Sequence, residues 1–186
     1  MASNTHDNVA PGRLHLRLRL PFSWDCIESV RQAVSAVIAA SLNNELLAEQ
    51  MAMVASELLE NAVKHGEAGP IELCLEATDG QLDVAIGNAI GPDSVSVDQL
   101  SARIEFIRLF PSAREAYLAA LSAVYEQGLA SSSSTQSTLG LARIAAEGEC
   151  LLQCNIPRPG WLTVSALRRI PPQQAPVYPV SEESAQ

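Results

Sequence analysis

The sequence predicts an α/β fold with two layers, a mixed but mainly antiparallel sheet that carries long helices on one face. Segments with alternating apolar residues occur near the start, in the middle and near the end of the chain, and long segments with helical periodicity lie between them. Of the 186 residues, 47% are hydrophobic but only 4% are aromatic, so the core is expected to be aliphatic. A chain of this length can bury such a core as one domain.

The N-terminal part starts with polar residues over 1–12, which we expect to form a flexible arm. Leucines then alternate with polar residues over 13–20, a pattern that is typical of a half-buried strand. Pro21 ends this strand, and helical periodicity follows over about 24–41. The single domain is expected to span 13–170.

A second, longer helix is expected over about 45–65, because leucine, methionine and valine recur along one side of it. Gly66 follows as the residue after the helix, a position where glycine often takes a positive φ. His65 falls on the apolar side of the helix, so we expect it to be a core or supporting residue rather than a catalytic one.

The middle of the chain predicts an antiparallel hairpin, with strands over 71–77 and 82–88 joined by an Asp-Gly turn. Two helices rich in apolar residues follow over about 97–110 and 112–127. Both helices belong to a region that is longer than a simple connection between strands.

The C-terminal part begins with a serine-rich stretch of low complexity and continues as a short helix over about 139–146. Two more strands are expected over 149–156 and 161–170. The tail over 171–186 is rich in proline and glutamine, and we expect it to be disordered.

The charge balance limits the kinds of partner. Twelve Lys and Arg against 21 Asp and Glu give a net charge of −9, which argues against nucleic-acid binding because phosphates require a basic face. No apolar run approaches the ~20 residues of a membrane span. We therefore expect a cytoplasmic protein without membrane contact, whose four cysteines are free thiols.

A polar stripe runs along the helix over 45–65. Glu57, Asn61 and Lys64 are spaced by four and three residues, which places them on one narrow face at ~100° per residue. A carboxylate can orient or deprotonate an attacking group, an amide oxygen can bind Mg²⁺, and an ammonium can neutralise phosphate. The alternative is an amphipathic helix with ordinary surface charges.

The ten residues from Glu57 to Gly66, with Asn61 and Lys64 at their spacing, resemble the N box of the histidine-kinase-like ATPases, also called the GHKL or Bergerat family. The order of elements is most similar to the bacterial anti-sigma-factor serine kinases. This resemblance implies the Bergerat ATP-binding fold, with ATP and Mg²⁺ as cofactors. It also implies that Glu57 is catalytic, that Asn61 binds Mg²⁺ and the nucleotide, and that Lys64 steadies the phosphates.

The expected adenine-reading residue of this family departs from its pattern. Asn88 stands where the family carries an aspartate, and Gly91 is the one glycine that remains of the following glycine pattern. An amide can pair with adenine or, turned round, with guanine, so the base preference stays open. Alternatively, Asn88 only caps the turn that leads to Gly91.

The segment Thr138-Leu139-Gly140-Leu141 resembles the second glycine box of the family, in which the free N–H groups of a helix start bind phosphate. Thr138 replaces the first glycine, and its hydroxyl could itself donate to a phosphate. A Gly-Leu pair is also common where helices pack, so this box on its own is a weak signal.

The region over 92–138 corresponds to the lid of the family but carries many apolar residues. Ile107, Phe110, Leu118 and Leu121 are expected to form an apolar face that needs a partner. We expect a homodimer through 97–127 or a stable complex with another protein.

The sequence therefore predicts an ATP-binding regulatory protein of a bacterial signalling switch that resembles an anti-sigma-factor serine/threonine kinase. Its protein partner would be an anti-anti-sigma-like or sigma-like regulator. The alternative is a degenerate, non-catalytic relative that acts as a protein-binding scaffold, which the departures at Asn88 and Thr138 favour.

Overall fold

The computed structural model describes residues 14–78, 80–91, 95–127 and 133–170, and side chains are described at these positions except 95, 96, 127 and 133–138. The predicted arm over 1–12 and the predicted tail over 171–186 lie outside the described residues.

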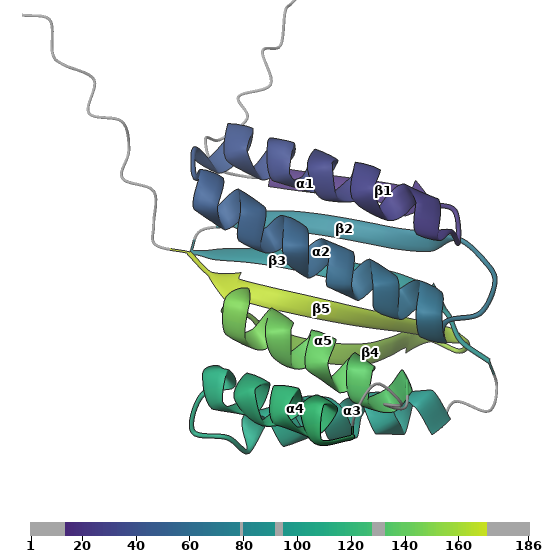
Figure 1. The fold of residues 1–186 in the computed structure, drawn as a ribbon. Helices are drawn as coiled ribbons and strands as arrows, with labels where there is room; N and C mark the ends of the chain where they lie inside the picture. Colours follow the sequence, from purple (N-terminus) through teal and green to yellow (C-terminus); the bar gives the residue numbers. More distant parts are fainter. Residues whose placement is uncertain (1–13, 79, 92–94, 128–132, 171–186) are drawn as a thin grey trace, which may run out of the picture.

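Five strands form one sheet in the order β1-β2-β3-β5-β4 (Figure 1). The strands are β1 (Leu14–Leu20), β2 (Ile71–Thr78), β3 (Gln81–Ala89), β4 (Leu151–Arg158) and β5 (Trp161–Arg169). Every ladder among these described strands is antiparallel, so the parallel pairing that a mixed sheet implies is not found in them. The predicted two-layer α/β architecture is confirmed.

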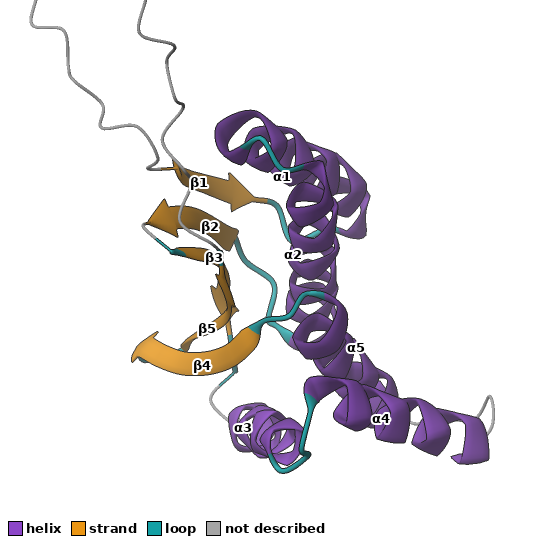
Figure 2. Cartoon of the chain, turned by 90° about the vertical axis from the view of Figure 1, so that its left-hand side faces the viewer, coloured by secondary structure: helices purple, strands orange, loops and turns teal. Residues whose placement is uncertain are grey.

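The helices form the second layer of the fold. They are α1 (Ile27–Leu42), which follows a 3₁₀ turn over Trp24–Cys26, α2 (Glu45–His65), α3 (Val95–Arg108), α4 (Ala113–Gln127) and α5 (Ser133–Glu147). Figure 2 shows α1, α2 and α5 on the same side of the sheet, while none of the described helices covers the opposite face. None of the described helices combines the length and the apolar character that a bilayer crossing requires.

The boundary between α1 and α2 is set by two asparagines. Asn43 ends α1 in the left-handed conformation with φ of 49°, which asparagine tolerates better than most residues. Asn44 then caps α2, because its side-chain oxygen accepts a hydrogen bond of 3.0 Å from the N–H of Leu47. The two helices consequently pack side by side with Ile38 and Met51 fully buried.

The hairpin of β2 and β3 supplies the central part of the sheet. Leu73 pairs with Ile86 and Leu75 with Val84, and all four side chains are buried against the helices. Gly80 takes a φ of +87° in the turn, which a residue with a Cβ rarely adopts. The apolar alternation that predicted the hairpin thus forms the floor under α2.

The predicted lid helices extend the helical layer instead of forming a separate flap. Ile104 and Ile107 of α3 are buried in the main core, with Ile107 only 7% exposed, and Phe110 packs against the same core. Leu118 and Leu121 of α4 are 50% and 44% exposed. The single apolar face expected from the sequence is therefore wrong in part: the α3 half is covered by the chain itself.

The start of α5 also differs from the sequence prediction. The helix begins at Ser133, six residues before the expected start at Leu139. Serine is a good residue both for a helix start and for a loop, so a run of serines does not show which of its members begins the helix. The earlier start changes the environment of Gly140.

Candidate functional site

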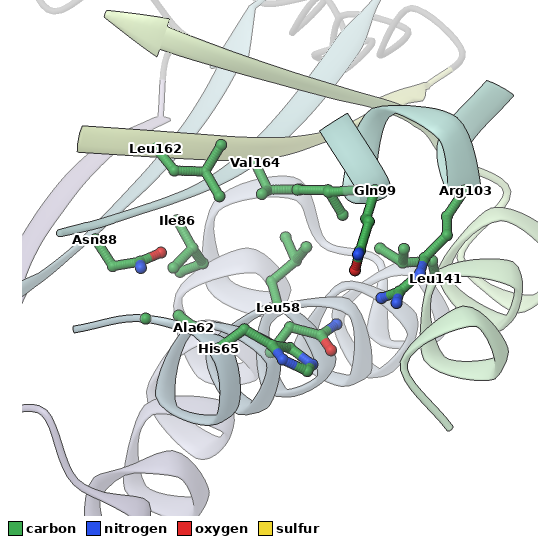
Figure 3. Close-up of a pocket in the computed structure, with 13 residues that line it drawn as sticks. Leu58, Ala62, His65, Ile86, Asn88, Gln99, Arg103, Leu141, Leu162 and Val164 are labelled. Atoms are coloured by element: carbon green, nitrogen blue, oxygen red, sulfur yellow. The ribbon is translucent and has the colours of Figure 1, made fainter. Parts of the chain in front are cut away.

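A cavity of about 170 Å³ lies between α2 and the sheet, with α3 on its far side (Figure 3). Its walls are mostly aliphatic, with Leu58 from α2, Ile86 from β3, Leu162 and Val164 from β5, and Leu141 from α5. Such a slot between a helix and a sheet suits a flat, largely apolar group.

Five polar side chains interrupt these apolar walls. Asn61 and His65 come from α2, Asn88 from β3, and Gln99 and Arg103 from α3. Figure 3 shows Asn88 at one end of the cavity and the α3 side chains at the other. A few convergent polar groups in an apolar cavity are typical of a ligand site.

Asn88 is the buried polar side chain of the described core, with 4% of its surface exposed. Its Nδ2 donates a hydrogen bond of 2.9 Å to the carbonyl oxygen of Ala89. The amide oxygen is then the atom of this side chain that remains suited to accept from a ligand. Asn88 also lines the cavity, which a residue that only caps a turn would not need to do.

Gly66 allows α2 to end directly against Asn88. A Cβ built at Gly66 would overlap the Nδ2 of Asn88 and would lie 2.5 Å from the carbonyl oxygen of Ala62. Its φ is −85°, so the expectation of a positive φ at this glycine is wrong. The glycine serves close approach, and it keeps the end of α2 next to the buried amide.

His65 is exposed on one side and faces the cavity on the other, so a place in the core is wrong, while a supporting role stays a prediction. Burial of part of the imidazole lowers its pKa, and the positive charges of Lys64 and Arg103 lower it further. The helical wheel placed His65 on the side facing the sheet, but this is the last residue of α2, where the cavity opens.

The polar stripe of α2 is divided between the cavity and its surroundings. Asn61 lines the cavity, Lys64 is exposed outside it, and Glu57 does not reach it. Glu57 instead forms an ion pair with Arg143 of α5, with 3.0 Å between Oε1 and Nη1. Arg143 also pairs with Glu147 at 2.9 Å, so it joins α2 to α5.

Glu57 has an unusual protonation equilibrium. Its side chain is 19% exposed, and burial together with the nearby charge of Glu60 raises its pKa, although Arg143 opposes this shift. A carboxylate with a raised pKa is typical of a general base or acid. In the structure, however, this carboxylate is occupied by the guanidinium of Arg143.

Gly140 lies well inside α5, because that helix begins at Ser133. Only the first four N–H groups of an α-helix lack a partner in the helix, and the N–H of Gly140 is not among them. The basis for placing phosphates at Gly140 as a helix start is therefore wrong. A Cβ at Gly140 would lie 2.8 Å from Oε2 of Glu57, so this glycine serves the close approach of α5 and α2.

The remaining predicted site residues lie at different distances from the cavity. Leu141 lines it, whereas Leu139 is half-buried against the core and does not. Gly91 does not line it either, and a Cβ there would lie 2.9 Å from Oε1 of Glu67. The side chain of Thr138 is outside the described residues.

Sequence reasoning missed the two α3 residues of the cavity. Gln99 and Arg103 are four residues apart, so they share one face of α3. That spacing was readable from the sequence, but the side of the helix that faces the cavity depends on how α3 packs against α5 and β4. Neither residue belongs to a motif that would have singled it out.

The residues present fit the base of a nucleotide better than the whole of ATP-Mg²⁺. Asn88 and the aliphatic walls suit a planar base, and Asn61 offers an amide oxygen that suits Mg²⁺. The cavity is smaller than the ~300–1,000 Å³ that is usual for a complete ligand site. A triphosphate would have to lie outside it, and Gly140 offers no helix start there.

No protein-family profile matches this sequence, and no curated protein matches it either. Among solved structures, the chain is similar to a chain of the crystal structure of the SiaB-SiaC complex from Pseudomonas aeruginosa, with a TM-score of 0.58 and 20% sequence identity. The similarity covers 82% of this chain and 88% of that chain. At this identity the match shows a shared fold.

Proposed function

We propose that this chain is a regulatory protein of a signalling switch that binds a purine nucleotide in the cavity beside α2 and binds a partner protein. The observation that carries the nucleotide half of the proposal is Asn88, a buried amide that lines an otherwise aliphatic cavity. Nδ2 of Asn88 has a partner in the carbonyl oxygen of Ala89, and the place of this amide in an aliphatic cavity wall offers a ligand a specific polar contact.

The geometry of Asn88 favours a base that presents an N–H group. Because Nδ2 already donates one hydrogen to Ala89, the side-chain oxygen is the natural acceptor for a hydrogen from the ligand. The amino group of adenine provides such a hydrogen, and so does N1–H of guanine. The second hydrogen of Nδ2 can donate to N1 of adenine or to O6 of guanine, so the proposal covers both purines.

Two observations support a protein partner. The structure that this chain resembles in fold is that of a complex between two proteins, SiaB and SiaC. In addition, Leu118, Leu121 and Tyr125 are exposed along α4, and Tyr125 is 88% exposed. The resemblance to the anti-sigma-factor kinases suggests a regulator of the anti-anti-sigma or sigma type, and a second copy of this chain is the other occupant considered.

The ion pair of Glu57 bears on whether the protein transfers phosphate. With Arg143 bound to this carboxylate and no helix start at Gly140, the structure favours the non-catalytic scaffold over the kinase. The raised pKa of Glu57 is the observation that favours a serine/threonine kinase as second candidate, with Mg²⁺ held by Asn61. Release of Glu57 from Arg143 would then be a requirement for activity.

The nucleotide half is tested by calorimetric titration with ATP, ADP and GTP, each with and without Mg²⁺. We expect purine nucleotides to bind, and the ratio of ATP affinity to GTP affinity measures the base preference. Asn88→Ala is expected to weaken ATP binding by about tenfold. A flat titration at millimolar ATP with Mg²⁺ would overturn the nucleotide proposal.

The partner half is tested on α4. Leu118→Glu combined with Leu121→Glu should leave the protein folded, because both side chains are exposed, and should abolish self-association or binding of the partner. Sedimentation of the wild type and the variant distinguishes a homodimer from a complex with another protein. A wild type that is monomeric, and a variant that binds every candidate regulator as the wild type does, would contradict this half.

A further inference from the structure

The end of the cavity formed by α3 carries positive charge. Arg103 of α3 and His65 of α2 both line it, and Gln99 of α3 and Asn61 of α2 add two amides. Figure 3 shows Gln99 and Arg103 on the opposite side of the cavity from Asn88, with the His65 ring between them. We call the group of Arg103, His65 and Gln99 the α3 edge.

The charge of the α3 edge contrasts with that of the whole chain. The protein has a net charge of −9, yet no Asp or Glu is among the described residues that line the cavity. The ion pairs of the described residues do not include Arg103 either. A cation that faces a cavity without a carboxylate beside it is suited to an anionic ligand.

An anion bound at the α3 edge would lie near the C-terminal end of α2, so its binding requires nearby cations. The carbonyl end of a helix carries a partial negative charge, which repels an anionic group. Lys64 in the last turn opposes that charge, and Arg103 approaches from the other side of the cavity. The donors for an anion thus come from α3 as well as from α2.

The alternative place for phosphates is closed in this structure. The α5 side presents Glu57, whose oxygen would touch a Cβ at Gly140, and the N–H of Gly140 is inside the helix. A carboxylate at this position disfavours an anion. Its guanidinium partner, Arg143, is shared between Glu57 and Glu147.

We propose that Arg103 and His65 bind the phosphate of a nucleoside monophosphate whose base lies against Asn88, with Gln99 as a further donor. The inference rests on the proposed nucleotide site and assigns its anion-binding residues. Under this proposal, contacts from α3, which lies outside the α2 motif, make the site bind a nucleotide more tightly than the corresponding nucleoside. A fork-shaped guanidinium suits phosphate oxygens geometrically.

The test compares the binding of adenosine and of AMP by calorimetry. Wild type should bind AMP at least tenfold more tightly than adenosine, because charge-assisted hydrogen bonds add to the contacts of the base. Arg103→Gln should remove most of this difference, because it should weaken AMP binding much more than adenosine binding. His65→Gln should remove a smaller part of it.

The matched control is Arg114→Gln, which removes the same charge from an exposed position on α4. It should leave both affinities unchanged. A salt series on the wild type gives a second readout that needs no variant: AMP affinity should fall with salt while adenosine affinity stays constant.

The outcomes separate the two proposals. If adenosine binds but AMP binds no more tightly, or if Arg103→Gln leaves AMP affinity unchanged in a folded protein, the assignment of the α3 edge is overturned while the base site stands. If neither adenosine nor AMP binds, the nucleotide site itself is wrong and the assignment falls with it.

Discussion

Helices α2 and α5 both border the cavity from the helical layer. Both use a glycine to approach a neighbouring group closely, but the two approaches have different consequences. Each carries a glycine at a close approach: Gly66 brings the end of α2 against Asn88, and Gly140 brings α5 against Glu57. The first contact places a buried amide in the wall of the cavity. The second contact places the carboxylate of Glu57 beside α5, the helix on which the sequence motif predicted a phosphate site.

The difference between these contacts shows which half of the motif the structure supports. On α2, the glycine meets backbone and a buried amide, neither of which can move cheaply. On α5, the glycine meets the end of a longer side chain that has its own ion pair with Arg143. On the α2 side the glycine contact thus holds a residue that lines the cavity, whereas on the α5 side it is a contact between two helices.

The largest effect is expected for Gly66→Ala, which tests the close contact between the end of α2 and Asn88. The added Cβ would overlap the Asn88 amide and the carbonyl oxygen of Ala62, so we expect a loss of about 1–3 kcal/mol in the free energy of unfolding and a loss of nucleotide binding. Chemical denaturation and calorimetry measure the two effects. Gly69→Ala is the matched control, because its Cβ would lie 3.7 Å from the Cβ of Ala89, an ordinary contact.

A second prediction concerns the pH dependence of binding on the α2 side. The pKa of His65 is lowered in the free protein by burial and by the charges of Lys64 and Arg103, so a bound phosphate should raise it again. Binding then takes up a proton at His65, so the ratio of wild-type to His65→Gln affinity for AMP should rise as pH falls from about 8 to about 6. The variant reports the effect of protonating the phosphate of AMP itself, whose second pKa is about 6, and an equal slope in both proteins would contradict the prediction.

The third prediction concerns the stability that the Glu57 carboxylate contributes beside α5, and Glu57→Gln tests it. Because burial raises the pKa of Glu57 in the folded state, the stability that its proton contributes is present below the unfolded pKa and lost as pH rises through the folded pKa. We expect the variant to gain stability over the wild type at pH 7 relative to pH 4. Thermal unfolding at both pH values measures this, and a larger loss at pH 7 would show that the Arg143 ion pair outweighs burial.

The smallest effect is expected for Gly140→Ala. Alanine favours the helix by about 1 kcal/mol over glycine, and the displacement of the Glu57 carboxylate offsets part of that gain. The net change in unfolding free energy should stay within about 0.5 kcal/mol, with AMP affinity unchanged. If the folded variant loses nucleotide binding, the phosphate site would have to be assigned to α5 instead of the α3 edge.

Features marked by local chemistry were predictable from the sequence, and those that depend on packing were not. The bounds of α2 follow from Asn44, which caps it, and from the apolar residues on its buried side. The start of α5 was missed because every serine in its first turns is a suitable start. The α3 edge was missed because Gln99 and Arg103 line the cavity only as a result of how α3 packs, which the sequence does not show.

The candidate site divides in the same way. Asn61 and Asn88 were named from the sequence, and the structure brings both to one cavity although they lie on different layers. Glu57 and Gly140 were also named, and the structure brings these two together, but outside that cavity. Spacing along one helix places side chains on a face, but it does not show where the adjoining cavity ends.

The position of β5 has a consequence for how the chain reaches this structure. It is the last described strand along the sequence, yet it lies inside the sheet, where it pairs with β3 on one side and β4 on the other. Until β5 is synthesised, the edge of β3 stays open and β4 lacks its strand partner, so both can pair wrongly. Pairs as distant in sequence as Gln81 with Arg169 make such a closure slow. Since Leu162 and Val164 of the same strand line the cavity, the ability to bind a ligand arises only with this final step, and a ligand would select chains that have completed it.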